Sequence, residues 1–171
     1  MDCRDFDPQL CIVQLTDFHF EELQGNYQKR VDDILVTIKK SIKSGTVLLL
    51  VTGDVARTGK ESEYQSAAMF FDYLIEQLNQ PEYQLKVYIL PGNHDLQGPC
   101  KSVGCFAGAQ YGVDIENMTS FFEFANKYDN RFVFGQPGPI VFEVEGTKVS
   151  VSGFNSAPLS TLDGDDKGFH V

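Results

Sequence analysis

Side chains of the kinds that bind divalent metal ions follow three short apolar runs in this sequence. They are, in chain order, Asp17 with His19, then Asp54, then the run Asn93, His94 and Asp95. Mixed nitrogen and oxygen ligands suit Mn, Fe, Zn and similar ions, among which the sequence does not choose. A carboxylate has two oxygens, so Asp54 can bridge two cations, and Asn93 offers an amide oxygen to a second one. Asp17 and His19 would point the same way in extended backbone.

The combination of these motifs is more specific than any one of them. An Asp-x-His pair arises by chance in roughly one chain in five, and a Gly-Asp step usually marks a turn. The string Gly-Asn-His-Asp at 92–95 is expected in roughly one chain in a thousand or fewer. All three motifs follow apolar runs, in order, so we put a purely structural origin of the whole set at roughly one in fifty.

The segments around the motifs predict alternating strands and helices. The predicted strands are Leu10–Leu15, Val47–Val51 and Leu85–Leu90. Apolar residues recur every three or four positions over 31–42 and 64–78, which indicates two helices, the first stopped by Gly45. This order predicts a βαβαβ parallel sheet with right-handed crossovers. The carboxyl ends of its strands would bring the three motifs to one edge.

The second half of the chain predicts less regular structure. A Gly-rich loop over 96–114 precedes a short helix at about 116–128. The strands Ile140–Val144 and Lys148–Ser152 flank Glu145-Gly146-Thr147 and predict a β-hairpin. The segment after Phe154 has no period. No linker divides the chain, so we expect one α/β domain over residues 1–171.

Charge and cysteine content narrow the classes of function. The formal net charge of −10 argues against binding to nucleic-acid backbones. The longest apolar run is too short to span a bilayer and the acidic N-terminus lacks a signal core, so we expect a cytoplasmic protein without a membrane partner. The cysteines, which lack CxxC spacing, are expected to be free thiols, although Cys100 and Cys105 share a loop and can pair if oxidised.

The three motifs resemble the first three signature blocks of calcineurin-like metallophosphoesterases. The matching strings are Thr16-Asp-Phe-His, Val51-Thr-Gly-Asp-Val and Leu90-Pro-Gly-Asn-His-Asp. Gly59, Tyr64 and the segment Gly153-Phe-Asn-Ser-Ala are most similar to the branch that contains class III cyclic-nucleotide phosphodiesterases. The resemblance covers 10–157 and implies the N-terminal half of a four-layer α/β/β/α sandwich.

The resemblance implies a role for each motif residue. Asp17 and His19 would hold one divalent cation, Asn93 would hold a second, and Asp54 would bridge both. His94 would stabilise the transition state or donate a proton, and Asp95 would orient it. The two cations would activate water for in-line attack on phosphorus in a small phosphoester substrate.

Two departures from the family pattern affect the expected function. Ser/Thr phosphatases of the family carry an arginine that here falls one position early, as Arg57, which favours a diester such as a cyclic nucleotide over a phosphoprotein. The family also adds a further histidine and a Gly-His-x-His motif, whereas only His170 remains here, and we expect it to be an exposed tail residue. We therefore expect a larger polypeptide, with residues 1–171 alone inactive and binding at most one ion.

Two other functions stay open at this point. A non-catalytic interaction module would retain a half-built metal site without turnover. A nuclease of the same superfamily would need a basic groove from elsewhere, because this chain is acidic. A downstream histidine and Gly-His-x-His motif would favour the enzyme, and their absence would favour the module.

Overall fold

The computed structural model describes residues 9–21, 27–97, 115–128, 132–133, 135–155 and 157. Its central feature is a parallel sheet of three strands, β1 (Leu10–Leu15), β2 (Gly45–Thr52) and β3 (Tyr83–Leu90). The strands lie side by side in chain order, and β2 and β3 each begin two residues earlier than predicted. The α/β class and the parallel βαβαβ sheet are confirmed.

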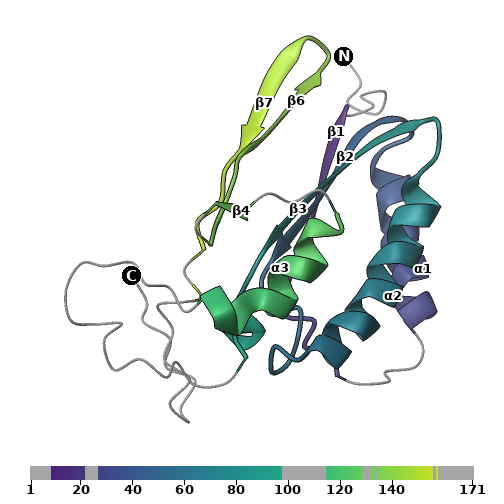
Figure 1. The fold of residues 1–171 in the computed structure, drawn as a ribbon. Helices are drawn as coiled ribbons and strands as arrows, with labels where there is room; N and C mark the ends of the chain where they lie inside the picture. Colours follow the sequence, from purple (N-terminus) through teal and green to yellow (C-terminus); the bar gives the residue numbers. More distant parts are fainter. Residues whose placement is uncertain are drawn as a thin grey trace.

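Two helices connect the strands, α1 (Tyr27–Ser41) and α2 (Glu61–Leu78). Both lie on the same face of the sheet (Figure 1), as expected when successive crossovers have the same hand. The prediction that Gly45 stops the first helix is wrong, because α1 already ends at Ser41 and Gly45 opens β2. Gly45 has φ +127, and a Cβ there would lie 2.7 Å from the carbonyl oxygen of Gln9. Glycine therefore allows the backbone preceding β1 to pass close to the start of β2.

Side chains of β2 alternate between two apolar layers. Val47, Leu49 and Val51 pack into the larger core under the helices. Leu48 packs on the opposite face of the sheet, with Tyr88 of β3. Because both faces are covered, the strand is apolar at every position from 47 to 51.

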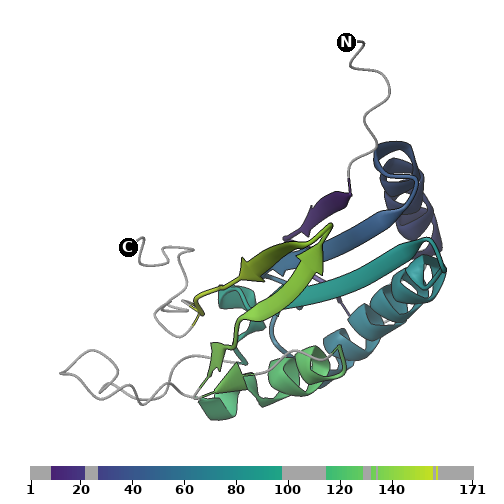
Figure 2. The same cartoon turned by 90° about the horizontal axis from the view of Figure 1, so that it is seen from above.

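The second face of the sheet is covered by the predicted hairpin, β6 (Ile140–Val144) and β7 (Thr147–Val151). Its two-residue turn places Glu145 and Gly146 at φ 48 and 76, the positive values that a type I′ turn requires. Figures 1 and 2 show the hairpin on the side of the sheet away from the helices. Helices, sheet and hairpin thus form three layers of the predicted α/β/β/α arrangement.

The remaining described elements are short. The helix predicted over 116–128 is divided into a 3-10 turn, η3 (Ile115–Met118), and α3 (Thr119–Asn126), which packs against α2. Two strands of two residues each, β4 (Phe132–Val133) and β5 (Gln136–Pro137), were not predicted. Asn155 is buried and ties them to the core, since its Nδ2 donates to the Gly135 carbonyl at 2.8 Å.

Several sequence predictions cannot be followed in the structure. Cys11 is a free thiol, whereas Cys100, Cys105 and His170 lie outside the described residues. Most of the predicted loop over 96–114 also lies outside the described residues. Among the described residues, no helix combines the length and apolarity needed to cross a bilayer.

Candidate metal centre

The backbone segments that follow β1 and β2 continue side by side beyond the ends of the strands. The Asp17 N–H donates to the Gly53 carbonyl at 3.3 Å, and the His19 N–H donates to the Asp54 carbonyl at 3.0 Å. An isolated parallel bridge joins the two segments again between Phe20 and Ala56. This extension of the parallel pairing brings the first two motifs together.

Three of the predicted ligands have left-handed backbone. Asp17, His19 and Asp54 have φ of 54, 47 and 54. Glu145, in the hairpin turn, is the only other non-glycine residue with positive φ in the described part of the chain. Such residues cost about 1–3 kcal/mol each and cluster at functional sites. The expected extended backbone at 17–19 is therefore wrong, yet His19 Nε2 still lies 3.8 Å from Asp17 Oδ1.

The third motif reaches the first two because glycines face each other. A Cβ on Gly53 would lie 2.8 Å from the Gly92 Cα, and a Cβ on Gly92 would lie 2.0 Å from Asp54 Oδ1. Neither position can carry a side chain unless the two loops move apart. The close approach allows the His94 backbone N–H to donate to Asp54 Oδ1 at 3.0 Å.

Ligand atoms of His19, Asp54 and His94 all lie within 4.8 Å of one another. The rings of His19 and His94 meet edge to face with centroids 4.6 Å apart. Two imidazoles and a carboxylate at this spacing fit a single Zn, Mn or Fe ion. Asp17, whose side chain is 64% exposed, lies beside His19. Asn93 is half-buried and begins the 3-10 turn η2 (Asn93–Asp95).

The His94 ring is oriented by a backbone carbonyl. Its Nδ1 lies 2.9 Å from the carbonyl oxygen of Arg57. A carbonyl only accepts, so Nδ1 carries a proton and Nε2 is the nitrogen left for a metal or a substrate. The predicted orienting residue, Asp95, does not fill this role. A main-chain partner leaves no signal in residue types, which is why sequence reasoning missed it.

Asp95 is instead a buried carboxylate that fastens two loops together. Its oxygens accept four hydrogen bonds, from the backbone N–H groups of Gly92 (2.9 Å), Val55 (3.2 Å) and Ala56 (2.8 Å) and from the Tyr64 hydroxyl (2.9 Å). Burial raises the pKa of the Asp95 carboxyl to about 6, and these hydrogen bonds oppose the rise by stabilising the charged form.

Tyr64 supports the same carboxylate from α2. Burial, followed by the negative charge of Asp95, raises the pKa of the Tyr64 hydroxyl above its ordinary value. The hydroxyl therefore keeps its proton and remains a donor throughout the neutral pH range. The sequence placed Tyr64 on the apolar face of its helix, and nothing in that periodicity indicated a polar partner.

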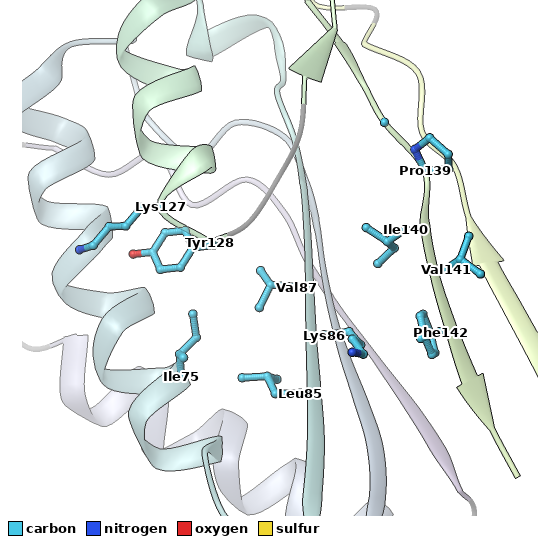
Figure 3. Close-up of a pocket in the computed structure, with 11 residues that line it drawn as sticks. Ile75, Leu85, Lys86, Val87, Lys127, Tyr128, Pro139, Ile140, Val141 and Phe142 are labelled. Carbon is cyan, nitrogen blue, oxygen red and sulfur yellow. The ribbon is translucent and has the colours of Figure 1, made fainter.

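A pocket of about 560 Å³ lies elsewhere, along the outer edge of β3 (Figure 3). Leu85 and Val87 lie on the helix side of β3, towards Ile75 and Tyr128, whereas Lys86 lies on the other side of the strand, towards Ile140 and Phe142 of β6. None of the predicted metal ligands lines this pocket. Among the described residues, the group that could hold a metal ion lies at the ends of the strands, away from this pocket.

The model of a family described as calcineurin-like phosphoesterase matches residues 11–170. This range contains all three motifs and the hairpin. No curated protein matches the chain.

Proposed function

The chain belongs to the calcineurin-like phosphoesterase family, and we propose that it hydrolyses a phosphodiester with the aid of bound divalent cations. Family membership supports a metal-dependent phosphoester hydrolase in general. The observation that most favours this function in the present chain is the grouping of His19, Asp54 and His94 within 4.8 Å. Three loops, each at the carboxyl end of a different strand, supply these ligand atoms.

The metal-binding residues that we propose are those of the three motifs. Asp17, His19 and Asp54 would hold one cation, and Asp54 with Asn93 would contribute to a second. Bound divalent cations polarise phosphoryl oxygens and make water nucleophilic at neutral pH. Asp54 is suited to bind a cation because its side chain is held in place. The His94 backbone N–H donates to Oδ1 at 3.0 Å, and Oδ2 is not used in that contact.

The His94 ring would supply the proton chemistry. Its Nδ1 donates to the Arg57 carbonyl, so Nε2 is the atom that can stabilise a phosphoryl oxygen or protonate the leaving group. The carbonyl accepts the Nδ1 proton whether or not Nε2 carries one, so the ring keeps its orientation when Nε2 gains or loses a proton.

The ion pair between Arg57 and Glu21 favours a diester over a phosphoprotein as the substrate. The Arg57 guanidinium pairs with Glu21, and both side chains are exposed. An arginine already paired with a carboxylate is less available for the dianionic phosphoryl group of a phosphoprotein. A diester carries a single negative charge and needs less compensation. We favour a cyclic nucleotide as the diester, and we propose that the protein acts in the cytoplasm.

A comparison of two chromogenic substrates tests the reaction class. With Mn²⁺, the full-length protein should hydrolyse bis(p-nitrophenyl) phosphate faster than p-nitrophenyl phosphate, and EDTA should stop both reactions. Preference for the monoester would contradict the diester assignment. Absence of metal-dependent turnover on both substrates would contradict a phosphoesterase.

A matched pair of variants tests the metal assignment. Asp54→Asn should abolish Mn²⁺ binding measured by calorimetry, because it removes the charge shared by the proposed sites. Asp32→Asn, at an exposed carboxylate on α1, should bind Mn²⁺ as the wild type does. We expect residues 1–171 to bind at most one ion, because only Asp54 and Asn93 are proposed for the second site. Equal binding by the two variants would remove Asp54 from the ligands.

A further inference from the structure

Tyr64 lies where α2, α3 and the metal-centre loops meet. Its hydroxyl donates to Asp95 Oδ1 at 2.9 Å and lies 3.2 Å from the Asp95 carbonyl oxygen. Its ring packs against Phe121 and Phe124 of α3, with centroids 6.2 and 5.4 Å away. Tyr64 is 4% exposed and Asp95 is 0% exposed, so neither side chain can touch a substrate in solution.

The Asp95 carboxylate joins the loop after β2 to the loop after β3. From the first loop it accepts the N–H groups of Val55 and Ala56, the two residues that follow Asp54. From the second loop it accepts the N–H of Gly92, the residue before Asn93. The same loops meet again where the His94 N–H binds Asp54 Oδ1. The separation of Asp54 and His94 therefore depends on the buried contact behind them.

We propose that Tyr64 and Asp95 are positioning residues of the metal centre, which set the distance between the loop carrying Asp54 and the loop carrying His94. The inference rests on the proposed function for the identity of the bound ion. Tyr64 acts through Asp95: its hydroxyl occupies one acceptor site of Oδ1 and fixes the rotation of the carboxylate toward the three backbone donors. Without this donor, the carboxylate can turn and both loops gain freedom.

Tyr64→Phe tests the proposal, because it removes the hydroxyl and keeps the ring between Phe121 and Phe124. Tyr88→Phe is the matched control. Tyr88 is equally buried and its hydroxyl accepts the Gly153 N–H at 2.8 Å, but it lies on the hairpin face of the sheet. The Kd for Mn²⁺, measured by calorimetry on folded protein, should rise about 10- to 100-fold in Tyr64→Phe, the usual effect of removing support behind a metal ligand. Tyr88→Phe should stay within about twofold of the wild type.

Equal Mn²⁺ affinity in the two variants would overturn the proposal, since a merely structural role lowers stability in both. If Tyr64→Phe does not fold, 3-fluorotyrosine introduced singly at 64 or 88 gives a second test. Addition of Zn²⁺ should shift the ¹⁹F resonance at 64 and leave the one at 88 in place, and an unshifted resonance at 64 would overturn the inference. Neither measurement uses turnover, so a protein that binds Mn²⁺ without hydrolysing a phosphoester would contradict only the proposed function.

Discussion

His94 contributes two different groups to the metal centre. Its backbone N–H holds Asp54 Oδ1 at 3.0 Å, and its ring is fixed through Nδ1 by the Arg57 carbonyl at 2.9 Å. Substitution by alanine removes the ring and keeps the N–H. The backbone contact with the proposed ligand and the proposed proton chemistry can therefore be separated at a single residue.

In the full-length protein, His94→Ala should lower kcat on a diester by about 10²–10⁴-fold, the usual contribution of a general acid or base. Its Mn²⁺ content, measured by atomic absorption after gel filtration, should equal that of the wild type, because Asp17, His19 and Asp54 remain. His19→Ala is the contrasting variant and should lose the ion. Loss of Mn²⁺ from His94→Ala would instead make His94 a ligand, as its place beside His19 and Asp54 permits.

At the scale of the elements, the centre depends on a close approach between the loop after β2 and the loop after β3, which leaves no room for a side chain where they meet. Gly53 and Gly92 face each other where the second and third loops meet. A Cβ on Gly92 would lie 2.0 Å from Asp54 Oδ1 and 2.5 Å from the Asp54 backbone nitrogen. The Asp54 side chain could rotate away from a methyl group on residue 92, but its backbone nitrogen could not. The loop that carries Asp54 would therefore have to move.

Gly92→Ala should lower the free energy of unfolding by about 1–3 kcal/mol, as an overpacked site does, and should also abolish Mn²⁺ binding. Gly146→Ala is the control, because Gly146 has φ +76 but no atoms within 4 Å of its would-be Cβ. It should cost about 1–2 kcal/mol from backbone strain alone and bind Mn²⁺ normally. Chemical denaturation and calorimetry measure the two quantities. Normal binding by Gly92→Ala would show that the loops need no close approach.

At the scale of the whole molecule, the sheet joins two cores of unequal size. The larger core fills the space under the helices, and the smaller one holds the hairpin on the other face. Phe142 is the one described hairpin residue that is fully buried, at 6% exposure, and it packs with Leu48 and Tyr88. Phe142 is thus the most buried side chain that the hairpin contributes to this contact, beside the partly buried Ile140, Val144, Val149 and Val151.

Phe142→Ala should lower the free energy of unfolding by about 3–5 kcal/mol, the usual cost of truncating a buried phenylalanine. Val141→Ala, at a position that is 52% exposed, should change it by about 0.5 kcal/mol or less. Urea denaturation of both variants measures the difference. Similar stabilities would show that the hairpin does not depend on this contact.

The sequence by itself determined the three strands of the parallel sheet, the two long helices, the hairpin and the order of the three motifs. Apolar periodicity and residue type are local properties, and in this chain they agree with the fold. These properties alone predict that Asp17, His19, Asp54 and Asn93 converge at the ends of parallel strands, and the structure brings ligand atoms of His19, Asp54 and His94 together there. The family match over residues 11–170 agrees with the superfamily that the motif strings resemble.

Only the tertiary structure decided how the motif residues relate to one another. The left-handed backbone at Asp17 arises because the segment after β1 must follow the one after β2. Asp95 binds Tyr64 and backbone N–H groups, and the His94 ring is held by the carbonyl of Arg57, 37 residues away in sequence. Each contact joins a side chain to the main chain or to a residue distant in sequence. No spacing or composition records such a contact, because it exists only once the loops have packed together.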